Sequence, residues 1–121
     1  MIQEIAFTVY AVTDMKKARA FYEGVLGLIP SPEYDGTKSA NWIEYNIGTG
    51  TFAIGSSPDW KTSQDGASVA FEVSDFDDFV KKLKDKGVPF KMEAQNFPTC
   101  SMAVVRDPDM NNILIHKRKA K

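Results

Sequence analysis

The hydrophobic and polar positions of this chain follow one pattern that occurs twice. Residues 6–28 and residues 68–88 each read as an alternating strand that ends near an Asp, an amphipathic helix, and then a glycine. In the first copy Asp14 stands at the expected helix N-cap and Gly27 at the expected helix end, and Gly87 ends the helix of the second copy. This internal repeat predicts two related modules.

Three extended segments, separated by turn residues, follow each predicted helix. They span residues 29–34, 39–47 and 51–55 in the first module and residues 90–97, 100–106 and 112–117 in the second. The order βαβββ, present twice, predicts an α+β fold in which two modules form a curved, cup-like mixed sheet with helices on its outer face. The modules are expected at residues 1–58 and 67–121 of a single domain, 1–121, joined by the polar loop 56–67. The sheet face without helices is expected to line a cavity, where a ligand would bind.

The composition narrows the classes of partner and compartment. The chain has 121 residues, enough for one domain, with 15 basic against 16 acidic residues and a formal net charge of −1. This balance lacks the basic surface that nucleic-acid binding requires. The single cysteine, Cys100, suits a reducing compartment and a role as a small buried hydrophobe. No apolar run approaches the ~18 residues of a membrane span. We therefore predict a cytoplasmic protein without nucleic-acid or membrane partners.

Several motifs, in order along the chain, resemble those of one family. They are Val12-Thr13-Asp14, the helix end with Ala20-Phe21-Tyr22 and Val25-Leu26-Gly27-Leu28, the strand 69–73 leading into Asp75, and Arg106-Asp107-Pro108-Asp109. Together they resemble the vicinal oxygen chelate superfamily, which includes glyoxalases, bleomycin resistance proteins and extradiol dioxygenases. The resemblance covers essentially the whole chain and rests on scaffold motifs, so it implies the fold. It also implies a homodimer, because many members of this length pair their modules across two chains.

The resemblance further marks the positions at which enzymes of that superfamily bind a divalent metal through His or Glu. Carried over one at a time, these positions hold Phe7 and Ala53 in the first module and Ser68 and Leu114 in the second, or Ile115 if the last strand shifts by one residue. Phenyl, methyl, hydroxymethyl and isobutyl groups do not hold a borderline cation. The resemblance therefore implies no metal cofactor at the usual site.

The turn before the last predicted strand departs from the family pattern. The family commonly has Gly after Asp-Pro-Asp, whereas this chain has Met110-Asn111-Asn112. A left-handed backbone conformation is cheap for Gly and tolerated by Asn, but costly for Met. We therefore expect one of the Asn residues to adopt the positive φ.

The first functional hypothesis is a small-molecule binding protein of the glyoxalase/bleomycin-resistance type that sequesters an aromatic or amphipathic compound without metal. Flat aromatic walls suit such a ligand. The expected ligand-binding residues are Phe7, Val9, Trp42, Trp60, Ser68 and Leu114, with Phe52 or Phe97 added according to strand parity.

The alternative is a metal-dependent lyase, isomerase or dioxygenase of the same superfamily whose ligands have moved. Glu44, Glu72 and His116 are candidate catalytic residues, because a carboxylate in an apolar cup, or an imidazole near neutral pH, can act as an acid or a base. Two carboxylates and an imidazole could also bind a divalent metal such as Zn, Ni, Mn or Fe. A third hypothesis is a scaffold or regulatory protein whose cup is filled by its own side chains.

Overall fold

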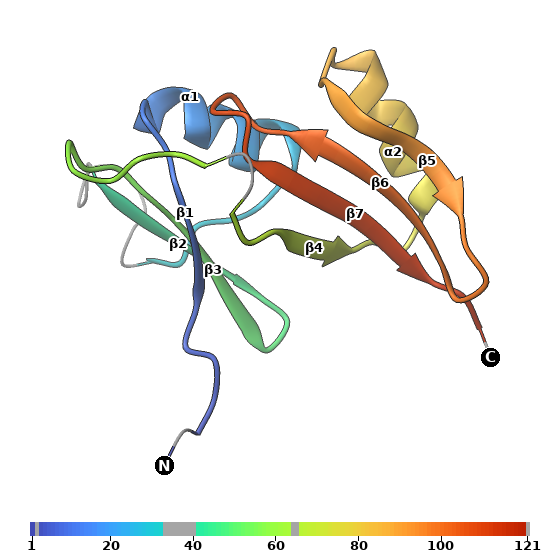
Figure 1. Cartoon of the computed structure of the whole chain (residues 1–121), viewed down its shortest axis with the longest axis horizontal. Coiled ribbons are helices and arrows are strands. Elements are labelled where there is room, and N and C mark those ends of the chain that lie inside the picture. Colours follow the sequence, from blue (N-terminus) through green and yellow to red (C-terminus); the bar gives the residue numbers. More distant parts are fainter. Residues whose placement is uncertain (2, 33–40, 64–65, 121) are drawn as a thin grey trace. The chain divides into compact units, whose positions relative to one another are not determined.

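The computed structural model describes residues 1, 3–32, 41–63 and 66–120. The chain forms two compact units, Met1–Ser63 and Gln64–Lys121, and each is a sheet accompanied by a helical segment (Figure 1). The boundary between the units falls inside the predicted loop 56–67. That both units make up one domain stays a prediction.

The first unit is built on a three-stranded mixed sheet. Its strands are β1 (Thr8–Ala11), β2 (Trp42–Ile47) and β3 (Gly50–Gly55), in the order β1-β3-β2. β3 is parallel to β1 and antiparallel to β2. Of the strand predicted over residues 29–34, the described part forms only an isolated bridge between Pro30 and Tyr45. Prolines at positions 30 and 32 lack the N–H that a sheet ladder needs, and residues 33–40 lie outside the described part.

The first helix changes its winding midway. The α-helix α1 (Met15–Arg19) continues into a π-helical segment, η1 (Ala20–Val25). Asp14 caps the N-terminus by accepting a hydrogen bond from the backbone N of Lys17 at 3.1 Å, and Gly27 ends the helix with φ of +79°, both as predicted. The wider π winding was not predicted, since apolar positions over one turn fit either period.

The second unit contains a four-stranded mixed sheet and one regular helix. The elements are β4 (Val69–Glu72), α2 (Phe76–Asp85), β5 (Phe90–Asn96), β6 (Cys100–Arg106) and β7 (Asn112–Arg118), with the strand order β4-β7-β6-β5. β4 is parallel to β7, and the other pairs are antiparallel. The α+β class predicted from the repeated βαβββ pattern is confirmed, with one mixed sheet in each unit.

Each sheet has one face that carries its unit's hydrophobic core and one that does not. In the first unit the core face holds Tyr45 and Phe52, whose rings contact the helical Tyr22, and all three are buried. In the second unit α2 contacts β7, where Ile113 and Ile115 are fully buried. We call the other side of each sheet its open face. Strand alternation sends every second residue there.

The turn between β6 and β7 corrects one prediction. Met110, and not an Asn, has the positive φ, at 68°. The buried carboxylate of Asp107 accepts hydrogen bonds from the backbone N of Asp109 at 2.9 Å and of Asn111 at 2.8 Å, and from Asn111 Nδ2 at 2.9 Å. These bonds fix the turn and engage the side chain of Asn111. They therefore hold Met110 in a conformation that costs roughly 1–2 kcal/mol.

Candidate ligand-binding site

The open face of the first sheet carries most of the predicted ligand contacts. Val9 pairs with Ala53, and Ala53 pairs with Glu44 on its other side, so these three residues form one row across β1, β3 and β2. Trp42 pairs with Gly55 in the next row along the same face. This face is where the alternation of residues 7, 9, 42 and 44 was expected to put them.

Three aromatic rings gather on this open face, and we call Phe7, Trp42 and Trp60 the aromatic cluster. The indoles of Trp42 and Trp60 are nearly parallel, with an interplanar angle of 9° and ring centroids 6.3 Å apart. The ring of Phe7 meets Trp42 edge to face at 5.3 Å and 88°. Both geometries are favourable for aromatic pairs. Phe7 is 43% exposed and Trp60 38% exposed, so the cluster presents aromatic surface to solvent.

A glycine makes room for the two indoles. A Cβ at position 55 would lie 2.5 Å from Cζ3 of Trp60 and 3.0 Å from Cε3 of Trp42. Both distances are shorter than carbon–carbon contact, which is about 3.5–4.0 Å. Gly55 is therefore the residue that allows Trp60, from the loop after β3, to lie over the sheet beside Trp42.

Glu44 supplies the polar group of this face. Its Oε2 accepts a hydrogen bond from Nε1 of Trp42 at 2.8 Å, which satisfies the indole N–H and fixes the ring. The carboxylate puts negative charge beside the aromatic cluster. This charge favours a neutral or cationic ligand over an anion.

A pocket of about 420 Å³ within the first unit has one ring of the aromatic cluster, that of Trp60, in its lining. Its lining includes Trp60 and Lys61 from the loop after β3, together with Val12 and Thr13 at the end of β1. This volume is at the small end of the range for ligand sites.

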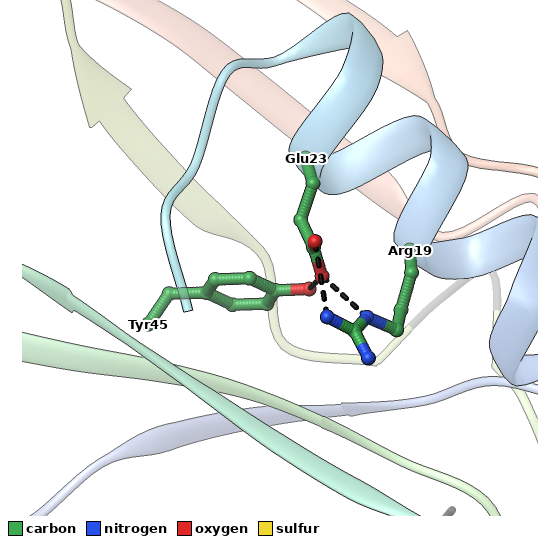
Figure 2. Close-up of polar contacts among 3 residues, drawn as sticks. All are labelled: Arg19, Glu23 and Tyr45. Atoms are coloured by element: carbon green, nitrogen blue, oxygen red, sulfur yellow. Dashed lines mark hydrogen bonds and ion pairs between the residues drawn. The ribbon is translucent and has the colours of Figure 1, made fainter. Parts of the chain in front are cut away.

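The core side of the first sheet holds a polar network that the sequence did not reveal (Figure 2). The hydroxyl of Tyr45, a fully buried residue, donates to Oε2 of Glu23 at 2.9 Å. Glu23 also accepts two hydrogen bonds from the guanidinium of Arg19, at 2.6 and 3.1 Å. Burial, followed by the hydrogen bond to the Glu23 carboxylate, raises the pKa of Tyr45 well above its usual range. The network thus anchors the helical segment to β2 and keeps the phenol protonated.

The second unit brings together two of the candidate catalytic residues. Glu72 on β4 pairs with His116 on β7, and Oε1 of Glu72 lies 2.6 Å from Nδ1 of His116. Oε2 of Glu72 accepts from the backbone N of Arg118 at 2.8 Å. The backbone hydrogen bond from Arg118, and then the bond to His116, lower the pKa of Glu72. An ionised carboxylate only accepts, so Nδ1 carries the imidazole proton and Nε2 is the nitrogen left for another partner.

The remaining predicted residues divide between the two faces. Leu114 pairs with Ala70 and shares the open face with His116. Ile115 is buried on the core face. Ser68 is exposed just before β4. Phe52 faces the core, since its ring contacts Tyr22. Leu114, and not Ile115, thus lies on the open face.

The four residues that the resemblance assigns to metal positions offer a single donor atom among them. Phe7 is a ring of the aromatic cluster, Ala53 is fully buried, and Leu114 has no donor atom, which leaves only the hydroxyl of Ser68. Within residues 1, 3–32, 41–63 and 66–120, no three His, Cys, Asp or Glu side chains lie close enough together to hold a metal. Glu72 and His116 form a pair only.

Comparisons with known proteins agree with this architecture. The family model described as Glyoxalase/Bleomycin resistance protein/Dioxygenase superfamily matches residues 4–115. A Bacillus anthracis protein assigned to the glyoxalase family has a similar structure, with a TM-score of 0.80, 24% identity, and 98% of each chain covered.

Two further solved structures are similar at lower identity. TnmS3, an antibiotic binding protein from Streptomyces sp. CB03234, has a TM-score of 0.78 and 20% identity over 98% of both chains. FosX, a fosfomycin resistance protein from Listeria monocytogenes, has a TM-score of 0.76 and 16% identity, covering 98% of this chain and 96% of its own. At these identities the likeness shows the fold alone. No curated protein sequence matches the chain, and the described helices are all too short or too polar to cross a membrane.

Proposed function

We propose that this chain, which belongs to the Glyoxalase/Bleomycin resistance protein/Dioxygenase superfamily, binds a small, flat organic molecule at the aromatic cluster of its first sheet without a metal ion. The ligand would lie against Trp60 and Phe7, the two exposed rings, and Trp42 would support them from the sheet. The superfamily includes structural neighbours that bind an antibiotic or confer resistance to one, which is consistent with a sequestering role.

The observation that carries this proposal is the aromatic cluster itself. Exposed aromatic rings cost free energy in water unless something covers them, and soluble proteins rarely gather several in one place. Here two indoles and a phenyl ring lie within 6.3 Å of a neighbouring ring, and a glycine beneath them provides the space. Such an arrangement offers a flat ligand large contact area at little cost in side-chain entropy.

The carboxylate of Glu44 adds a preference of charge. It lies beside Trp42 and would attract a cationic or hydrogen-bond-donating ring system while disfavouring an anion. We therefore expect flat cations to bind better than flat anions of the same size.

Tryptophan fluorescence tests the proposal directly, because the chain has only two tryptophans and both belong to the cluster. Titration with proflavine, a flat tricyclic cation, is expected to quench this emission and saturate. Trp60→Ala should raise the dissociation constant about three- to tenfold, the loss of one aromatic contact. Phe97→Ala is the matched control, since Phe97 is equally exposed, at 39%, but lies in the second unit. Equal affinities for the two variants would refute the proposal.

The metal-dependent alternative rests on the contact between Glu72 and His116. A homodimer is proposed from the family resemblance, and a cytoplasmic location from the composition. Native mass spectrometry of freshly purified protein reads subunit number, bound metal and retained organic molecules together. A metal-free dimer, above all one with an organic adduct, supports metal-independent binding. A stoichiometric divalent metal contradicts it and directs mutagenesis to Glu44, Glu72 and His116.

A further inference from the structure

The second unit has a pocket of its own, at the end of the sheet where β6 begins and β7 ends. It has a volume of about 360 Å³ and is lined by Pro98 and Thr99 from the β5–β6 turn, by Cys100 at the start of β6, and by His116, Arg118 and Lys119 from β7 and the chain after it. All these residues belong to the second unit. The pocket therefore shares no residue with the aromatic cluster.

Hydrogen bonds between neighbouring segments hold the walls of this pocket. The backbone N of Lys119 donates to the carbonyl of Thr99 at 3.0 Å, and the backbone N of Phe97 donates to the carbonyl of Cys100 at 2.8 Å. Nζ of Lys119 donates to the carbonyl of Phe97 at 2.7 Å. These contacts tie the β5–β6 turn to the chain end, so the pocket is formed before any ligand arrives.

The lining has a one-sided charge. It contains a guanidinium, an ammonium and an imidazole, and no carboxylate. The carboxylate of Glu72, which is not in the lining, accepts from Nδ1 of His116 and from the backbone N of Arg118. Because Nδ1 donates to Glu72, Nε2 of His116 is an acceptor, which can take a hydrogen bond from a donor group of a ligand but not from its carboxylate.

Strand pairing places the reactive and basic groups on one face. Cys100 pairs with Arg118, and His116 pairs with Met102, so the thiol, the guanidinium and the imidazole all project from the open face of the second sheet. Directly opposed side chains in an antiparallel pair have their Cβ atoms about 4.5–5.5 Å apart. An anion held by Arg118 would thus lie next to the sulfur of Cys100.

We propose that this pocket is a second ligand site, which binds a small organic carboxylate through Arg118, with Lys119 as a further hydrogen-bond donor. Arg118 is the principal residue because its planar fork matches a carboxylate in two parallel hydrogen bonds. The inference goes beyond the binding function proposed for the first unit, since it concerns other residues and a ligand of opposite charge.

The chain carries its own reporter for this site. Cys100 is the only cysteine, so the thiol that iodoacetate and iodoacetamide alkylate is the same one in both reactions, and peptide mass spectrometry follows its modification. In both reactions the thiolate attacks the CH₂ carbon, a C–S bond forms, and iodide leaves. The reagents have nearly the same size and differ in charge, so the ratio of their rates isolates the effect of a carboxylate entering the pocket.

Arg118→Gln is expected to lower the iodoacetate-to-iodoacetamide rate ratio about two- to fivefold, the range that an exposed ion pair gives. Lys91→Gln is the control, because Lys91 is exposed on β5 outside the pocket lining and its loss changes the net charge equally. A ratio that falls equally in both variants, or in neither, would overturn the proposal.

A non-covalent measurement gives an independent answer. His116 is the only histidine, so its imidazole proton signals can be followed by NMR without further assignment. Added benzoate should shift these signals to saturation in the native protein but not in Arg118→Gln, and the neutral benzamide should not shift them. Equal responses to benzoate and benzamide would contradict a carboxylate site. Neither result depends on Trp60, so failure here leaves the first unit's binding function untouched.

Discussion

Replacing Gly55 with Ala tests whether the space below the two indoles positions the aromatic cluster. The new Cβ would lie 2.5 Å from Cζ3 of Trp60 and 3.0 Å from Cε3 of Trp42. Carbon–carbon contact requires about 3.5–4.0 Å, so the ring of Trp60 has to retreat by about 1 Å. Trp60 is the ring expected to move, because it lies in a loop, whereas Trp42 belongs to β2 and is hydrogen-bonded to Glu44.

The size of the effect follows from three contributions. If Trp60 stays in place, the overpacked site costs about 1–3 kcal/mol. If Trp60 moves away, the clash disappears but the aromatic pair with Trp42, worth about 0.5–1.5 kcal/mol, is lost. These are two routes out of one clash and do not add. Alanine in place of glycine returns about 0.5–1 kcal/mol by reducing the freedom of the unfolded chain. We therefore expect the free energy of unfolding of Gly55→Ala to fall by about 1 kcal/mol.

Urea unfolding measures the stability, and near-ultraviolet circular dichroism reports the coupling of the two parallel indoles. Gly50→Ala is the matched control, since it lies on the same strand and its Cβ would meet only the carbonyl of Ile47, at an ordinary 3.6 Å. We expect Gly55→Ala to lose stability, the indole coupling signal and proflavine affinity, and Gly50→Ala to keep all three. If both variants behave alike, the argument from space below Trp60 is wrong.

Three further predictions concern the two hydrogen-bonded carboxylates and the first helix. Tyr45→Phe removes the donor to Glu23 and should lower the free energy of unfolding by about 1 kcal/mol. The raised pKa of Tyr45 gives a stability contribution that is complete only below the phenol's usual pKa of 10.0. The variant lacks this contribution, so it should lose less stability than the native protein as pH rises past that value. Glu72→Gln should flatten the acid side of the stability profile, because a lowered pKa gives a stability contribution that is present above the usual value of 4.5 and disappears as pH falls below it. Melting temperatures from about pH 6 to about pH 3 that stay parallel for the two proteins would contradict the hydrogen bonds that Glu72 accepts from Arg118 and His116. Gly24→Ala should raise the free energy of unfolding by about 0.5–1 kcal/mol, because a Cβ there meets nothing within 4 Å. A loss of stability in urea unfolding would instead show that the π-helical segment requires glycine.

The sequence predicted the secondary structure well where short-range rules act alone. Asp14 and Gly27 bound the first helix as expected, because capping and left-handed ends depend on a few neighbouring residues. β6 spans Cys100–Arg106, the range that alternation predicted. The prediction failed at Met110, since a buried carboxylate four residues from Asn111 dictated the turn, and no local preference contains that information.

The candidate site was partly predictable. Alternation placed Trp42 and Glu44 on the same side of one strand, and the structure has them there. The sequence spacing did not predict the stacking of Trp60 on Trp42. Trp60 lies in a loop, and the path of that loop depends on the sheet beneath it. The pairing of Glu72 with His116 was likewise open, since the two residues are far apart in the chain and meet only when β4 joins β7.

By itself, then, the sequence determined the α+β fold class, the βαβββ order of the second unit, and the residue types at the positions that the family resemblance assigns to a metal. These properties depend on residue types and on the hydrophobic period within one chain segment. Local sterics and hydrophobic burial act on such a segment without information from distant parts of the chain. The tertiary structure alone decided which side chains became neighbours: the indole stack over Gly55, the Tyr45–Glu23–Arg19 network, and the basic pocket beside Cys100. Strand register and loop paths set those contacts, because they depend on the simultaneous packing of segments that the sequence keeps apart.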